Sequence, residues 1–151
     1  MKDPNVTAGL YNTTFYGEYG FTDKLTGIIN LPLMSRSLVN NVISSTTQEV
    51  ISEGSAINNL GDVDLTIKYG LYNNGFIALS ASVIFGLPLG EDAGGPERNL
   101  QTGDGEFNEM VRVDAGFSLV HSENISVYGN IYGGYNQRNK GFSDELRFGA
   151  E

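Results

Sequence analysis

Apolar and polar residues alternate along most of this chain with a period of two. In the clearest run, residues 63–71, every odd position is apolar and the even positions are polar or small, Lys68 among them. After Asn74-Gly75 the alternation resumes over residues 77–89. Such alternation is typical of a half-covered β-strand, and Asn-Gly between two runs is a strong hairpin signal. The sequence therefore predicts a β-hairpin with one apolar and one polar face.

The same alternation recurs on both sides of this hairpin. It covers residues 14–21, 25–33, 110–119 and 125–132, and a last segment, residues 143–150, begins another strand. No apolar stripe with helical spacing competes with it. We therefore expect an all-β fold, an antiparallel up-and-down transmembrane β-barrel of about seven or eight strands. The eighth strand would lie near Asn5–Asn12.

Short and long connections alternate strictly between the predicted strands. The tight links are residues 22–24, 72–75 and 121–124, and the long ones are 35–59, 90–104 and 136–142. The long links are rich in Asn, Ser, Gly and acidic residues. Transmembrane barrels have this arrangement, with brief periplasmic turns at one end and extended extracellular loops at the other.

Alternation alone does not tell which face of the sheet points inward. In a soluble sandwich or lipocalin-like barrel the apolar face points inward. Here aromatic residues of the apolar face gather near strand ends, as in the interfacial girdles of membrane barrels. Charged residues gather on the opposite face, as in a wet lumen; they are Asp62, Asp64, Lys68, Glu106, Arg112 and Asp114. An arginine at Ser82 would then point into the lumen and cost less than one at Val83.

Length and composition limit the remaining classes. A chain of 151 residues predicts a single domain, residues 1–151. Its net charge of −9 argues against a nucleic-acid partner, because the phosphate backbone requires a basic surface. Without cysteine, the chain has no disulfide and no thiolate metal site. No segment is apolar enough for a transmembrane helix, and the N-terminus has no signal-peptide pattern.

Four motifs resemble one family of membrane barrels. They are YGFTDKLT at Tyr19–Thr26, the strand pair opening with Gly61-Asp62, LPLG at Leu87–Gly90, and TGDGEFN at Thr102–Asn108. Together they are similar to the outer-membrane barrels named for the meta-pathway of phenol degradation. The resemblance implies a transporter-like barrel in a Gram-negative outer membrane, with a channel for small hydrophobic compounds. Members are usually longer and end on an aromatic residue, so we expect this barrel to be incomplete at its C-terminal end.

Candidate site residues lie on the polar face of the predicted sheet. Mixed charges on neighbouring strands either plug a narrow barrel through ion pairs or line a selective constriction, and the sequence leaves both open. Tyrosine and asparagine side chains on the following strand are suited to contact an amphipathic solute. The candidate lumen-lining residues are Asp62, Asp64, Lys68, Arg112, Asp114, Tyr128, Asn130 and Tyr132.

Catalytic and metal-binding patterns are weak. His121-Ser122-Glu123 is the only cluster of histidine, serine and acid, and three consecutive residues in a tight turn rarely converge as a triad. Acids between residues 91 and 106 lack EF-hand spacing, and TGDGE lacks the lysine of a phosphate loop. We therefore expect no enzyme, no metal and no cofactor.

Three classes of function follow from these observations. The first is an outer-membrane barrel for passive passage or binding of small hydrophobic molecules, whose partners are the membrane lipid and the solute. The second is a structural or adhesive barrel that acts through its long loops. The third is a soluble secreted β-barrel or sandwich that binds a ligand inside.

Overall fold

The computed structural model describes residues 7–44, 46–121 and 126–151. Within these ranges the protein is all-β. None of the described residues belongs to a helix able to span a membrane. The strands are β1 (Ala8–Gly20), β2 (Leu25–Val39), β3 (Val42–Ile43), β4 (Val50–Ser52), β5 (Ser55–Asn59), β6 (Val63–Asn73), β7 (Ile77–Leu87), β8 (Asn108–His121), β9 (Ser126–Arg138) and β10 (Glu145–Ala150). All seven segments predicted from alternation are therefore strands.

One antiparallel sheet contains most of these strands. Its order is β1-β2-β6-β7-β8-β9-β10, so neighbours in the sheet follow one another along the chain except where β3, β4 and β5 intervene. The register joins residues of equal parity, for example Val83 with Val111 and Ser82 with Arg112. In the β7–β8 and β8–β9 pairs this puts the odd, mostly apolar positions on one face and the even, mostly polar positions on the other.

The structure corrects one predicted connection and one predicted strand. The segment Ser35–Asn59 is not a plain loop, because β2 continues to Val39. The C-terminal part of β2, which we call its outer half, pairs with β5 from Ser35↔Asn59 to Val39↔Ser55. The N-terminal part, Leu25 to Asn30, which we call its inner half, pairs with β6. Residues 8–12 extend β1 rather than forming an eighth strand.

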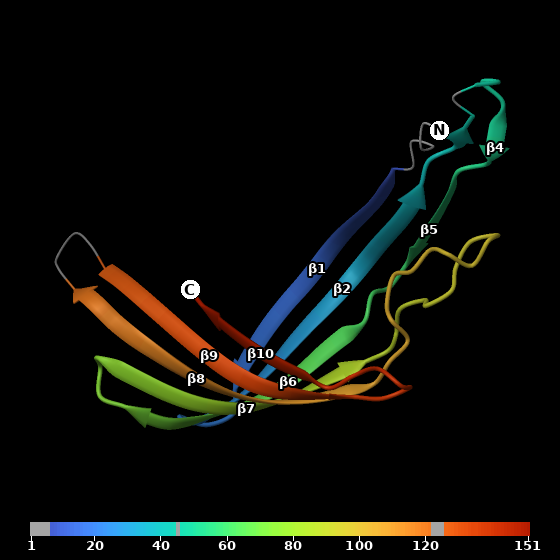
Figure 1. Cartoon of the computed structure of the whole chain (residues 1–151). Helices are drawn as coiled ribbons and strands as arrows, with labels where there is room; N and C mark the ends of the chain where they lie inside the picture. The colour runs from blue at the N-terminus through green and yellow to red at the C-terminus, as the bar shows by residue number, and fades with distance from the viewer. Residues whose placement is uncertain (1–6, 45, 122–125) are drawn as a thin grey trace. The chain divides into compact units, whose positions relative to one another are not determined.

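The described chain forms two compact units, and β1 and β2 pass through both. The first unit holds residues 1–15, 31–63 and 88–105, which include β3, β4, β5 and the loop after β7. The second unit holds residues 16–30, 64–87 and 106–151, with the inner part of β1 and β2 and all of β7 to β10. Strands β7, β8 and β9 bend along their length, so the sheet of the second unit curls (Figure 1).

Two tight turns of the second unit form as predicted. At the first, the Thr22 hydroxyl accepts hydrogen bonds from the backbone N–H groups of Lys24 and Leu25. At the second, the Asn74 side chain accepts from the N–H groups of Phe76 and Ile77, and Gly75 has a positive φ of 87°. Glycine tolerates that backbone geometry without the steric cost of a Cβ. Most of the third predicted turn, residues 121–124, lies outside the described residues.

The two faces of this sheet differ in solvent exposure. We define the polar face as the side that carries the even-numbered residues of β6, β7, β8 and β9, and the apolar face as the other side. On the apolar face, Val111 and Val113 are 59% and 52% exposed. On the polar face, Ser82 and Asp114 are only 5% and 6% exposed. The curl of the second unit therefore encloses polar side chains and leaves apolar ones outside.

Candidate functional site

A hollow of about 420 Å³ lies on the polar face of the second unit. Its walls come from β1, β2, β6, β7 and β8 together with the last residue of the chain. The lining side chains include Tyr16, Ile28, Thr66, Lys68, Ser82, Ile84, Arg112, Asp114 and Glu151. Because residues from five strands line one hollow, the sheet curls around its polar face.

Arg112 is fixed on this face by two neighbours. Its Nε and Nη2 donate to Oδ1 of Asp114, two residues along the same strand. Its guanidinium also lies 3.8 Å from the centre of the Tyr132 ring on β9, a cation–π contact. In the β8–β9 register Asp114 faces Tyr132. On the other side of β9, Tyr132 faces Gly149 of β10, and a Cβ at Gly149 would come within 2.6 Å of the ring, so this glycine leaves room for it. Three of the predicted site residues, Arg112, Asp114 and Tyr132, therefore form one cluster.

Lys68 lies between two hollows of the polar face. It lines the 420 Å³ hollow and also a second one of about 560 Å³, and Asp114 is likewise shared by both. The second hollow extends toward the tight turns, where Asn130 contributes to its wall. Lys68 forms no ion pair with any residue that the structure describes. Asp114 therefore forms an ion pair with Arg112 and not with Lys68, which lines the same hollow.

The other predicted residues are spread along the sheet. Tyr128 is exposed and lines a third hollow of about 560 Å³ together with Asn130, near the tight turns. Asp64 is half-buried at the start of β6, opposite Asn30 of β2. The prediction therefore collected residues along the length of the second unit rather than one compact site.

Asp62 belongs to the first unit and holds the loop that follows β7. Its Oδ1 accepts the N–H of Gly90 at 2.9 Å and its Oδ2 the N–H of Asp104 at 2.8 Å. A side chain at Gly103 would collide with the Asp62 carboxylate, which accounts for one glycine of the TGDGE segment. Burial raises the pKa of Asp62 above its ordinary 3.8; the two N–H groups oppose this rise and the Asp104 carboxyl adds to it.

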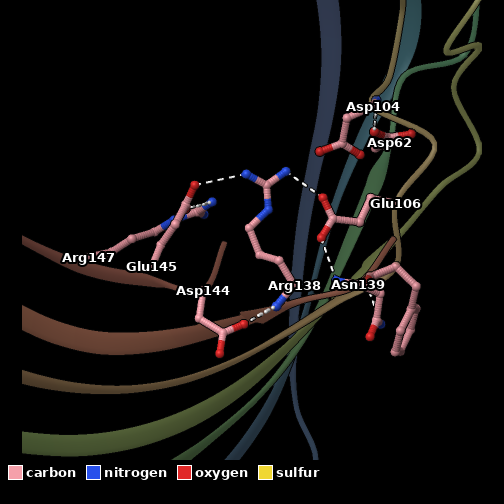
Figure 2. Close-up of polar contacts among 9 residues, drawn as sticks. Asp62, Asp104, Glu106, Arg138, Asn139, Asp144, Glu145 and Arg147 are labelled. Atoms are coloured by element: carbon pink, nitrogen blue, oxygen red, sulfur yellow. Dashed lines mark hydrogen bonds and ion pairs between the residues drawn. The ribbon is translucent and has the colours of Figure 1, made fainter. Parts of the chain in front are cut away.

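A larger charged cluster at the far end of β9 was not predicted as a site. Arg138 donates to Glu106 and to Glu145, and Arg147 donates to the same Glu145, so four charges alternate in sign (Figure 2). Glu106 is fully buried, and its second oxygen accepts the N–H of Asn139 at 2.7 Å. We call Glu106, Arg138, Glu145 and Arg147 the strand-end network. Only Glu106 had been placed on the polar face from the sequence.

A carboxylate, Asp144, and a buried amide, Asn136, border the strand-end network. The Asp144 carboxylate accepts a hydrogen bond from the Tyr135 hydroxyl. It also accepts one from the backbone N–H of Arg138 (Figure 2). The hydrogen bond from Tyr135, and after it that from Arg138, holds the pKa of Asp144 below 3.8. Asn136 of β9, which faces Glu145, is fully buried. Neither the Oδ1 nor the Nδ2 atom of its side-chain amide has a hydrogen-bond partner among the described residues.

The register could have revealed the strand-end network. Asn108 on β8 faces Arg138 on β9, and Glu106 precedes Asn108 by two residues, on the same side of an extended chain. Glu145 faces Asn136, two residues before Arg138. Both acids therefore converge on Arg138 once the pairing is known. The sequence alone does not predict this convergence, because it does not fix the register of strands that are joined by loops.

The described residues contain no group of three or more histidine, cysteine or acidic side chains that could hold a metal ion. His121-Ser122-Glu123 cannot be examined as a triad, since Ser122 and Glu123 and the side chain of His121 lie outside the described part. What the polar face offers is hydrogen bonding, charge and open volume. Such groups can form hydrogen bonds and ion pairs with a bound molecule.

No protein-family model, no curated protein and no solved structure matches this chain.

Proposed function

We propose that the chain forms the wall of an outer-membrane barrel whose polar face lines a path for small molecules. The odd positions of the sheet contact lipid in this proposal, and the hollows beside Lys68 and Arg112 receive the solute. The function is passive passage or binding, without catalysis. The motifs that resemble the barrels named for the meta-pathway of phenol degradation support the same assignment, including the outer-membrane location.

The observation that carries the proposal is the exposure of the apolar face. Strands β6 to β9 are 11–14 residues long, enough for the roughly 9–11 residues that cross a bilayer. Along them Ile67, Val111, Val113 and Ile131 are all more than half exposed. Contiguous apolar surface of this kind is unfavourable in water and favourable against lipid tails. The sheltered Ser82 and Asp114 occupy the side on which a membrane barrel has its lumen.

Cysteine accessibility tests the proposal directly. The full chain would be assembled into lipid vesicles with single cysteines at Val83, Val111 or Val113 on the apolar face. We expect these thiols to react with a membrane-confined maleimide and to resist a water-soluble one. Cysteines on the polar face, at Ser80 on the same strand as Val83 and at Thr66 on the neighbouring β6, are controls and should react with the water-soluble reagent. Efficient aqueous labelling of all three apolar positions would overturn the membrane assignment.

An adhesive or structural role is a second candidate, because the first unit is more ordered than a plain loop. Its β2–β5 pairing is continued by the β3–β4 hairpin, which exposes Ile43, Val50 and Ile51. Solute flux separates the two candidates. Flux through vesicles that persists after residues 41–54 are replaced by a short glycine-serine link would favour passage over adhesion.

A soluble ligand-binding barrel is the least supported class, since its apolar face would have to point inward. Detergent dependence separates it from the membrane candidates. A chain that stays monodisperse in buffer without detergent or lipid would favour the soluble class.

A further inference from the structure

Among the residues that the structure describes, one lysine of the polar face, Lys68, has no ion-pair partner. Arg112 is neutralised by Asp114, and Arg138 and Arg147 are neutralised in the strand-end network. Lys68 has no such partner among the described residues, although it is half-buried in the middle of β6. A sheltered ammonium without a carboxylate gains strongly from an anion that arrives from solution.

The surroundings of Lys68 indicate the shape of such a ligand. The 420 Å³ hollow places apolar Ile28 and Ile84 beside the hydroxyl-bearing Thr66 and Ser82. Its acids are Asp114, which is engaged by Arg112, and Glu151, an exposed residue that forms no ion pair with Lys68. A ligand with one anionic group and an apolar body would satisfy both the ammonium and the apolar wall.

We propose that Lys68 binds the carboxylate of a small amphipathic acid whose apolar part lies against Ile28 and Ile84. This inference rests on the proposed function, because it requires the polar face to receive a solute. It deepens that function by naming the solute class, an organic anion rather than a neutral hydrophobic compound. Because Lys68 borders both hollows, it also lies where a solute leaves one and enters the other.

The test compares an acid with its uncharged isostere. Benzoate and benzamide would be titrated into the full chain in detergent micelles, and the dissociation constants measured by calorimetry. We expect Lys68→Gln to weaken benzoate binding about tenfold, the loss of one charge-assisted contact, and to leave benzamide binding unchanged. Lys68→Arg keeps the charge and should restore most of the benzoate affinity. Arg98→Gln, which removes a positive charge from an exposed loop residue of the first unit, is the matched control.

Each other outcome overturns the inference in a distinguishable way. Equal benzoate affinity in the wild type and in Lys68→Gln would show that a solute binds elsewhere, and the proposed function would stand. A parallel loss of benzoate and benzamide binding that Lys68→Arg does not restore would assign Lys68 a structural role. If the wild type binds neither probe, the inference fails, and the cysteine-accessibility test decides the proposed function separately.

Discussion

Arg112 and Arg138 lie on neighbouring strands of the second unit, and both bind carboxylates, but their surroundings differ. Arg112 has one acidic partner, on its own strand, and its side chain is 28% exposed beside open hollows. Arg138 joins three segments, through Glu106 before β8 and Glu145 on β10, and its side chain is 16% exposed. The first arrangement leaves volume for a solute, whereas the second fills its space with protein.

The two clusters on the polar face differ in how completely their charges are paired. A fully partnered buried ion pair adds little net stability, because desolvation offsets the attraction of the charges, but the loss of one partner is strongly destabilising. The strand-end network is of that kind, since Glu106 is fully buried. Around Arg112 the charges are only partly paired, because Lys68 is left over. In the proposed function, the closed network belongs to a fixed part of the wall and the incomplete cluster receives the solute.

The largest expected effect is at Glu106. We expect Glu106→Ala to cost about 3–5 kcal/mol of unfolding free energy, because it leaves Arg138 partly buried with only one acid. Urea titration in lipid vesicles measures this. At the other cluster, Asp114→Asn should cost about 1–2 kcal/mol, since Arg112 is more exposed and keeps its contact with the Tyr132 ring.

Glu106→Gln is the matched control for the role of charge. Its amide oxygen can still accept the N–H of Asn139, so its cost should fall between wild type and Glu106→Ala. If Asp114→Asn cost as much as Glu106→Ala, the contrast between a closed and an open cluster would be wrong.

Arginine substitutions along β7 should have the next largest effects. Val83→Arg places a charge on the apolar face and should cost about 2–4 kcal/mol in lipid. Ser80→Arg faces Asp114 and should cost distinctly less. Ser82→Arg faces Arg112 from a buried position, so we expect it to cost at least as much as Val83→Arg.

The expectation for Ser82→Arg is the reverse of the one from alternation, because parity alone predicts a small free-energy cost for arginine at every polar-face position. The free energies of the three variants, measured in the same vesicles, separate the two views. Equal costs for Ser80→Arg and Ser82→Arg would mean that the charges of Asp114 and Arg112 do not shape this face.

The smallest expected effects come from pH. The pKa of Asp144 is lowered in the folded state, so its contribution to stability is present above pH 3.8 and is lost as the pH falls through the lowered value. The pKa of Asp62 is raised, so its contribution is present below pH 3.8 and is lost as the pH rises through the raised value. Carboxyl-carbon NMR titration should place the Asp144 midpoint below that of Asp62. The reverse order would contradict both assignments of cause.

Alternation predicted the strands well because each strand has one apolar and one polar side. The segments that became β6 and β7 were bounded to within two residues by their periodicity and the Asn-Gly turn. The same reasoning missed β5, whose sequence Ser-Ala-Ile-Asn-Asn has no clear alternation. That strand forms because the outer half of β2 provides a free edge to pair with, which is a property of the partner rather than of residues 55–59.

The site was predicted only in part, for the same physical reason. Lys68, Arg112, Asp114 and Tyr132 share one face, and parity finds them. Whether two residues of that face touch depends on register, which the loops conceal. Asp62 was counted with the face by its parity, yet its carboxylate binds the amides of a loop in the first unit.

The sheet order has one further consequence, for strand direction. Adjacent strands run in opposite directions along the order β1-β2-β6-β7-β8-β9-β10. The first and last strands of these seven, β1 and β10, therefore run in the same direction. Any wall that joins these two strands into a ring by antiparallel pairing must itself contain an odd number of strands. A second copy of this sheet, set in the same orientation, would meet both edges in parallel. Strand direction thus restricts what can complete a barrel.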